Sequence, residues 1–194
     1  MSATLNYGKV IIISAPSGAG KTSIVQTLLK KKLNLSFSVS ACTRDKRPLE
    51  KEGEDYYFLS VSAFKKAIAN DLFIEWEEVY NNQFYGTLKS EINRIWANNN
   101  HVIFDVDVKG GIALKNYFRS AALSIFIEPP TILELKNRLQ KRGADNVESI
   151  NKRIAKAEYE LSFKTNFDKL ITNTVLENAA KETEDIIKEF LCLE

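Results

Sequence analysis

The sequence near the start of the chain predicts a strand, then a glycine-containing turn, then a helix. Residues 9–14 include the β-branched run 10–13 and are typical of a short buried strand. Residues 15–20 form the turn, and apolar residues then recur on one face of a predicted helix at 21–33. This order constrains the fold more than any other feature, because it is the start of a parallel α/β sheet.

The turn carries a phosphate-binding pattern. Ala15-Pro-Ser-Gly-Ala-Gly-Lys21-Thr22 fits G-x-x-x-x-G-K-[ST], except that Ala15 stands where the first glycine belongs. Between a strand and a helix, the backbone N–H groups of such a loop converge on phosphate oxygens. The alternative, a glycine-rich turn that only precedes a helix, is disfavoured by the flanking elements. The residues predicted to bind nucleotide phosphates are Ala15, Pro16, Ser17, Gly18, Ala19, Gly20, Lys21, Thr22 and Ser23.

The rest of the chain alternates between strands and helices, with one interruption. Further strands are predicted at 36–39, 56–61, 73–79, 84–87, 101–108, 121–127 and 170–174, and further helices at 63–70, 87–98, 112–118, 131–141, 149–163 and 179–193. The alternation predicts a P-loop NTPase-type α/β fold with a parallel sheet flanked by helices. Residues 40–87 instead carry clustered short strands, which we interpret as a small antiparallel lobe inserted into the core.

Composition excludes several other classes of protein. The 194 residues suit one domain, and the net charge of +2, from 27 basic and 25 acidic residues, argues little for nucleic-acid binding. No apolar run approaches the length of a membrane span. Two cysteines far apart in the sequence are expected to be reduced, and we expect a cytoplasmic protein. A single histidine excludes a histidine-based metal site or catalytic triad.

Several motifs, in chain order, resemble those of the guanylate kinase family. The phosphate loop resembles the version of that family, which accepts alanine at the first glycine position. The further matches are Ser38-Val-Ser40-Ala-Cys-Thr43-Arg44-Asp-Lys-Arg47-Pro48, Tyr56-Tyr57-Phe58, Phe73-Ile74-Glu75-Trp76, Phe84-Tyr85-Gly86-Thr87, Asp105-Val106-Asp107, Arg138-Leu139 with Arg142-Gly143, and Asn151-Lys152-Arg153. The departures are Cys42, Leu49, Lys109 and Thr174, none of which replaces a group assigned to chemistry.

The resemblance implies that the second substrate is GMP, with dGMP as a further possibility. Two arginines can clamp a phosphate dianion through bidentate hydrogen bonds, and tyrosine hydroxyls can add neutral donors. The resemblance assigns to Glu75 the two adjacent donors of guanine, N1–H and the N2 amine, while two hydroxyls could bond O6. The residues expected to bind GMP are Ser40, Arg44, Arg47, Tyr56, Glu75, Tyr85, Gly86, Thr87 and Asp107.

Phosphoryl transfer to GMP requires positive charge rather than a general base. The acceptor phosphate is already ionised near neutral pH, because its second pKa is about 6. ATP would bring Mg²⁺, held by Thr22 and, through water, by Asp105. The catalytic cations would be Lys21, Arg44, Arg142 and Arg153, and Asn173 could contact adenine.

The predicted organisation is one guanylate kinase-like domain. It comprises a core at 1–39, 88–129 and 157–194, an acceptor-binding insert at 40–87 and a lid at 130–156. Two alternatives stay open: a P-loop kinase of another nucleoside monophosphate, and an inert guanylate-kinase-like interaction module. The sequence leaves the choice between a monomer and a homo-oligomer undecided.

Overall fold

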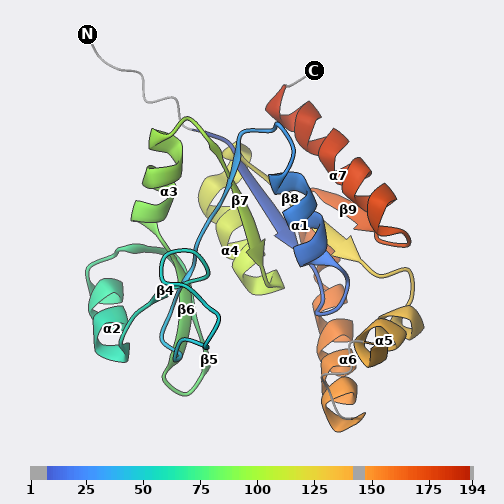
Figure 1. The fold of residues 1–194 in the computed structure, drawn as a ribbon, viewed down its shortest axis with the longest axis horizontal. Coiled ribbons are helices and arrows are strands. Elements are labelled where there is room, and N and C mark those ends of the chain that lie inside the picture. The colour runs from blue at the N-terminus through green and yellow to red at the C-terminus, as the bar shows by residue number, and fades with distance from the viewer. Residues whose placement is uncertain (1–7, 142–146, 193–194) are drawn as a thin grey trace. The chain divides into compact units, whose positions relative to one another are not determined.

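The structure, a computed structural model, describes residues 8–141 and 147–192 (Figure 1). These residues fall into two compact units. One contains residues 36–102, and the other contains residues 9–35 together with the described part of 103–194. Within the described residues no helix is both long enough and apolar enough to cross a membrane.

A five-stranded sheet provides the frame for the phosphate loop. Its strand order is β2-β7-β1-β8-β9, formed by Leu35–Phe37, His101–Val106, Val10–Ser14, Ala122–Glu128 and Lys169–Thr172. β1 runs parallel to β8, and β8 runs parallel to β9, as predicted from the alternation. All five residues of β1 are buried, which is typical of a strand covered on both faces.

Helices cover this sheet. The structure places α1 at Lys21–Leu29, α4 at Val108–Phe118, α5 at Ile132–Lys141, α6 at Val147–Leu161 and α7 at Leu176–Leu191, with short 3₁₀ turns at Arg119–Ala121 and Lys164–Asn166. α1 and α7 pack side by side, while α4 packs against β1 and β8 from the other side (Figure 1). α5 and α6 pack on each other through a cluster of Leu135, Leu139, Ile150 and Ala157.

Residues 36–102 contain a second, smaller sheet. Its order is β4-β3-β6-β5, formed by Tyr57–Phe58, Ala41–Cys42, Gln83–Leu88 and Phe73–Tyr80. The β3–β6 and β5–β6 pairs are antiparallel as predicted, whereas β3 and β4 are parallel. The helices α2 (Val61–Ala69) and α3 (Lys89–Ala97) both pack on β6. Phe64 lies at the centre of this core, stacked 4.3 Å from Phe73 and 5.4 Å from Phe84 between ring centroids.

Capping side chains explain where some boundaries differ from prediction. α4 begins at Val108 rather than at 112, because Asp107 Oδ1 accepts a hydrogen bond from the Gly110 N–H at 2.9 Å. β4 ends well before 61, because the Ser60 hydroxyl caps α2 by accepting from the Ala63 N–H at 3.1 Å. Short polar side chains thus decide element ends that hydrophobic periodicity does not mark.

Candidate active site

The phosphate loop ends in a residue that only glycine suits. Gly20, the N-cap of α1, has φ of 97°, a left-handed conformation that side chains disfavour. A Cβ atom there would also lie 2.3 Å from Nδ2 of Asn173. Gly20 has no side chain with which to cap α1, so the N–H groups of the first helical turn face the loop as donors. A helix start of this kind is suited to an anion such as a phosphate.

Three predicted side chains meet at the start of α1. Lys21 Nζ forms an ion pair with Asp105 Oδ1 and donates to the carbonyl of Val106 at 3.0 Å. Thr22 Oγ1 donates to the other carboxylate oxygen of Asp105 at 3.0 Å. Since Asp105 lies near the end of β7, the sheet brings it to the loop from 84 residues away in the sequence. Lys21 is therefore held by a carboxylate that a nucleotide phosphate could replace.

The same group is suited to a magnesium ion. Mg²⁺ prefers oxygen ligands and usually keeps several water molecules besides one or two protein groups and substrate phosphates. The Thr22 hydroxyl and the Asp105 carboxylate supply such oxygens within hydrogen-bond distance of each other. These residues thus fit the metal that the phosphate-loop motif implies.

Asn173 supports the loop from the end of β9. Its side chain is buried, and its Nδ2 donates to the carbonyl of Ala19 at 2.7 Å. Within the described residues its Oδ1 has no hydrogen-bond partner. Asn173 also borders a cavity of about 290 Å³, whose lining residues are Gly18, Gly20, Ser23, Arg138, Lys141, Asn173 and Leu176. The predicted contact with adenine stays a prediction, and the structure adds a second role, bracing the loop.

Arg138 was missed as a site residue, although it belongs to a motif that was recognised. Its Nη2 donates to the carbonyls of Asn173, at 2.9 Å, and Thr174, at 3.4 Å. Its Nε donates to Glu134 on the same helix at 2.9 Å. Arg138 therefore connects α5 to the segment that braces the loop. The sequence signal was the arginine itself, but only the fold shows which carbonyls it reaches.

The two predicted lid arginines have different outcomes. Arg153 Nη1 donates to the hydroxyl of Ser17 at 3.3 Å, which places it at the phosphate loop. Arg142 lies outside the described residues. A second α6 side chain, Glu160, is buried, and burial raises the pKa of its carboxyl while Lys156, 3.6 Å away, opposes that shift. Asp107, predicted to face GMP, caps α4 in this structure, and its contact with GMP stays a prediction.

The pair predicted to bind guanine lies in the smaller sheet. Glu75 on β5 and Thr87 on β6 are direct partners in the antiparallel register. The Thr87 hydroxyl donates to Glu75 Oε1 at 2.7 Å. Next to them, a Cβ on Gly86 would lie 2.7 Å from the carbonyl oxygen of Glu75 and 2.9 Å from Cβ of Trp76. The structure thus brings three of the predicted GMP residues together and shows why one of them is glycine.

Arg44 is held in place by a carboxylate that the site prediction omitted. Its two Nη atoms donate to the two oxygens of Glu50 at 2.6 and 2.5 Å, and its guanidinium lies 4.8 Å from the ring centroid of Tyr56. The Arg44 hydrogen bonds lower the pKa of Glu50 to about 2, and the same bonds raise the pKa of Arg44. Glu50 also accepts from the Arg47 N–H at 2.9 Å. Glu50 thereby holds the guanidinium of Arg44 and the backbone of Arg47.

The tyrosines and Ser40 complete this region. Tyr56 and Tyr85 pack edge to face, with ring centroids 6.1 Å apart. Ser40 is joined to β4 by its carbonyl, which accepts from the Tyr57 N–H at 2.9 Å. Within 36–102, the residues predicted to bind GMP therefore lie on the strands of one small sheet or in the loops next to them.

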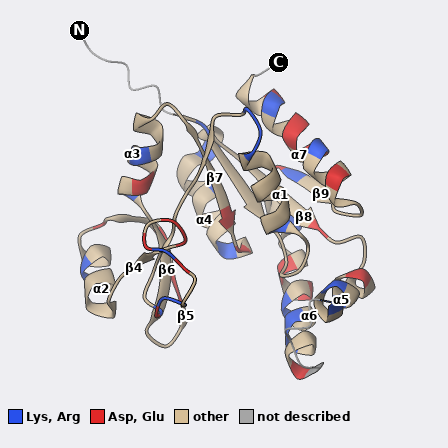
Figure 2. Cartoon of the chain, viewed as in Figure 1, with Lys and Arg blue, Asp and Glu red and all other residues tan. Residues whose placement is uncertain are grey.

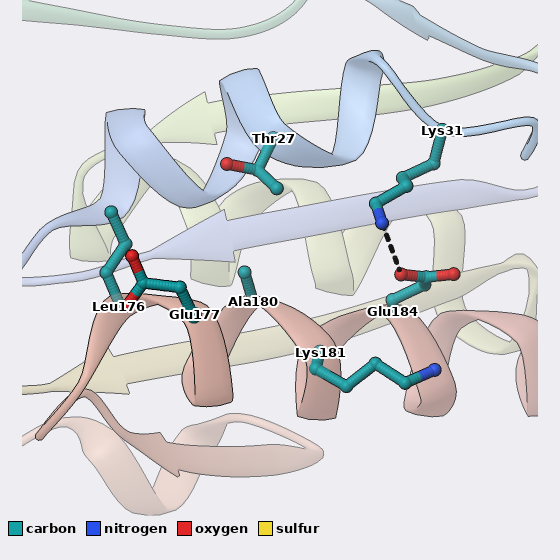
Figure 3. Close-up of a pocket in the computed structure, with 7 residues that line it drawn as sticks. All are labelled: Thr27, Lys31, Leu176, Glu177, Ala180, Lys181 and Glu184. Carbon is teal, nitrogen blue, oxygen red and sulfur yellow. Dashed lines mark ion pairs between the residues drawn. The ribbon is translucent and has the colours of Figure 1, made fainter.

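A second cavity, of about 230 Å³, lies between α1 and α7 (Figure 3). Its charged lining is partly neutralised, because Lys31 pairs with Glu184 at 3.3 Å, and Lys181 pairs with Asp185 at 2.6 Å. Both signs of charge occur on α6 and α7; on α6 the basic residues lie in the middle and the acidic ones toward the two ends (Figure 2). α6 carries three charges of each sign, whereas α7 carries five acidic and two basic residues. Mixed charge of this kind is typical of a solvated helix surface.

The comparisons with known proteins agree with one another. A family model described as guanylate kinase matches residues 7–190. A guanylate kinase from Bacteroides fragilis is 54% identical over 183 residues, covering 94% of this chain and 90% of that protein. One from Porphyromonas gingivalis is 47% identical over 184 residues, covering 94% and 98%.

Solved structures give the same result. The crystal structure of guanylate kinase from Anaplasma phagocytophilum matches with a TM-score of 0.74 and 29% identity, covering 94% of this chain and 86% of that one. A shikimate kinase from Bacteroides thetaiotaomicron matches with a TM-score of 0.50 and 16% identity, covering 95% and 99%, a likeness of fold alone.

Proposed function

The chain belongs to the guanylate kinase family, and we propose that it transfers the γ-phosphoryl group of ATP to the phosphate of GMP, giving ADP and GDP. The observation that carries this choice of acceptor is the Glu75–Thr87 pair beside Gly86. A phosphate loop alone is compatible with many kinases, since the shikimate kinase fold is also similar. The carboxylate and hydroxyl pair is what specifies guanine.

The donor side binds ATP through the loop at residues 15–23. Its N–H groups and Lys21 hold the phosphate chain, and Lys21 exchanges Asp105 for phosphate oxygens. Thr22 and, through water, Asp105 would hold Mg²⁺, which would neutralise charge on the transferring group. Arg153, at Ser17, and Arg142 add positive charge from the proposed lid at 130–156. These groups orient the γ-phosphoryl group and stabilise its charge.

The acceptor side binds GMP in the proposed insert at 40–87. Glu75 accepts hydrogen bonds from N1–H and the N2 amine of guanine. Ser40 donates to O6, and Thr87 does the same once its hydroxyl turns from Glu75 to the base. Arg44 and Arg47, with the Tyr56 and Tyr85 hydroxyls, hold the phosphate. Adenine lacks the N1–H and carries an amine in place of O6, so it leaves these groups unpaired. Such a site can reject the wrong base by about 10⁴-fold.

The two alternatives have less support. An interaction module has no use for the Lys21, Thr22 and Asp105 arrangement, which is intact here. A kinase for another monophosphate needs groups other than a carboxylate paired with a hydroxyl at positions 75 and 87. ATP and GMP are thus the small-molecule substrates, with dGMP a further candidate, and a cytoplasmic location stays a prediction.

A coupled assay of ADP release, with ATP and Mg²⁺, tests the proposal. GMP, AMP, CMP and UMP are offered in parallel to the same enzyme preparation. We expect turnover with GMP to exceed that with the other three by orders of magnitude. Turnover with a different monophosphate would keep the kinase but overturn the role of Glu75. Folded protein that binds GMP without turnover would instead support the interaction module.

A further inference from the structure

A buried carboxylate outside the predicted site ties the smaller unit together. Glu91, in the first turn of α3, has a side chain that is only 1% exposed. Both of its oxygens are hydrogen bonded twice. Oε1 accepts from the Val39 N–H at 3.0 Å and from Arg94 Nη2 at 2.8 Å, and Oε2 accepts from the Tyr57 hydroxyl at 2.9 Å and from Arg94 Nε at 2.8 Å.

The donors come from segments that carry proposed GMP contacts. Val39 directly precedes Ser40, and Tyr57 directly follows Tyr56. Glu91 itself lies four residues after Thr87, on the helix that continues from β6. One carboxylate therefore joins three separate stretches of chain, and each stretch holds a residue proposed to contact GMP.

The backbone alone links these stretches less completely. The Tyr57 N–H donates to the Ser40 carbonyl at 2.9 Å, which joins the first two segments. β3 and β4 are only two residues long, so their ladder is short. Within the described contacts, Glu91 links both segments to α3 through its side chain. Its loss would leave the β3–β4 and β3–β6 pairings to hold these segments by themselves.

Glu91 acts as an anion. Burial would raise the pKa of its carboxyl, but the hydrogen bonds from Arg94, Val39 and Tyr57 outweigh burial and lower it. An ionised carboxylate only accepts hydrogen bonds, and all four of its contacts here are donors. A neutral amide at this position would turn one acceptor into a donor that faces other donors.

We propose that Glu91 is a positioning residue for GMP: it holds the segments of Ser40, Tyr56 and Thr87 in the arrangement that binds the acceptor nucleotide. It touches no substrate and acts through Val39 and Tyr57. This inference rests on the proposed function. Glu91 should affect the binding of GMP and not that of ATP, because the residues that donate hydrogen bonds to Glu91 all belong to residues 36–102.

The test measures KM for GMP and for ATP separately in the wild type, Glu91→Gln and Tyr57→Phe. Glu91→Gln should raise KM for GMP by about tenfold, while KM for ATP stays within about twofold of the wild-type value. Tyr57→Phe removes one of the four hydrogen bonds to Glu91 and should raise KM for GMP by about threefold. Asp185→Asn is the matched control, because it makes the same carboxylate-to-amide change in an exposed ion pair on α7. Its two KM values should equal those of the wild type.

Ligand-induced thermal stabilisation separates positioning from general loss of structure. In Glu91→Gln the shift in Tm with GMP should shrink, and the shift with ATP should stay as in the wild type. Equal losses for both ligands, or an unchanged KM for GMP in folded Glu91→Gln, would overturn the inference. A wild type that neither binds nor phosphorylates GMP would instead overturn the proposed function, and this inference with it.

Discussion

The proposed donor and acceptor regions are built in different ways. The phosphate loop is one contiguous stretch, shaped by glycine backbone angles and attached to a strand buried along its whole length. Apart from Asp107, the proposed acceptor residues are scattered over residues 40–87. Two strands of that region, β3 and β4, have only two residues each, and β4 and β6 are only partly buried. Buried and semi-buried carboxylates, Glu50 and Glu91, hold that region together. Glycine backbone angles, supported by Asn173, therefore shape the first region, whereas a few charged side chains hold the second together.

The cations of the two regions also differ in where their partners lie. Lys21 pairs with Asp105, 84 residues away, so this pair forms only when the sheet is assembled. Arg44 pairs with Glu50, six residues away, within a single loop. The Lys21–Asp105 pair depends on the folded core of its unit, whereas the Arg44–Glu50 pair depends on one loop only. Substitutions in the two regions should consequently have effects of different kinds.

The largest effect is expected at Lys21. Lys21→Ala should lower kcat on the order of a thousandfold, because it removes the positive charge nearest to the transferring group. The circular dichroism spectrum and the affinity for GMP should stay near those of the wild type. A variant with ordinary turnover would contradict the assignment of Lys21.

Glu75→Ala should have the next largest effect, and it should act on the other substrate. Removal of the acceptor for two guanine donors should weaken GMP binding by about a hundredfold, with ATP binding little changed. Isothermal titration with each nucleotide measures both affinities. Equal weakening of the two nucleotides would show that the regions are not separate in function.

Gly20→Ala tests the backbone character of the donor region. The strained left-handed angle and the approach of the new methyl group to Asn173 should lower the free energy of unfolding by about 2 kcal/mol. Chemical denaturation measures this change. Adding Asn173→Gly should recover part of the loss, because it removes the clash but not the backbone strain. No recovery would mean that strain alone accounts for the loss.

The smallest effect concerns pH and Glu50. The pKa of Glu50 is lowered from its usual 4.5 to about 2, so its bond to Arg44 stabilises the folded state fully above pH 4.5. That contribution is lost as pH falls toward 2. The difference in unfolding free energy between the wild type and Glu50→Gln should therefore shrink over this range. A difference that stays constant from pH 6 to pH 2 would rule out this linkage.

Sequence reasoning was strongest where function lies in a contiguous pattern. The strand, loop and helix at the start of the chain follow in the predicted order, although the helix ends at Leu29 rather than at 33. Asp105 reaches Lys21 from near the end of β7, the neighbour of β1 in the sheet. Glu75 and Thr87 were predicted from the resemblance, and strand register makes them partners.

Other features could not be predicted, because they depend on contacts between distant or unremarkable residues. Glu91 looks like any charged residue in the first turn of a helix, and only the fold buries it against Val39 and Tyr57. Nor does the sequence show that Asn173 reaches Ala19. The start of α4 was placed too late, because a capping aspartate does not alter hydrophobic periodicity.

The support that Asn173 gives the phosphate loop has a consequence for protein synthesis. Ribosomes make the chain from its N-terminus, so the loop emerges more than 150 residues before Asn173. β1 pairs with β8 in the sheet, and this pairing cannot form until β8 has been synthesised. A nascent chain that ends before residue 173 therefore carries the whole phosphate-binding motif without the bracing that shapes it. Tight nucleotide binding should begin only after residue 173 has been synthesised.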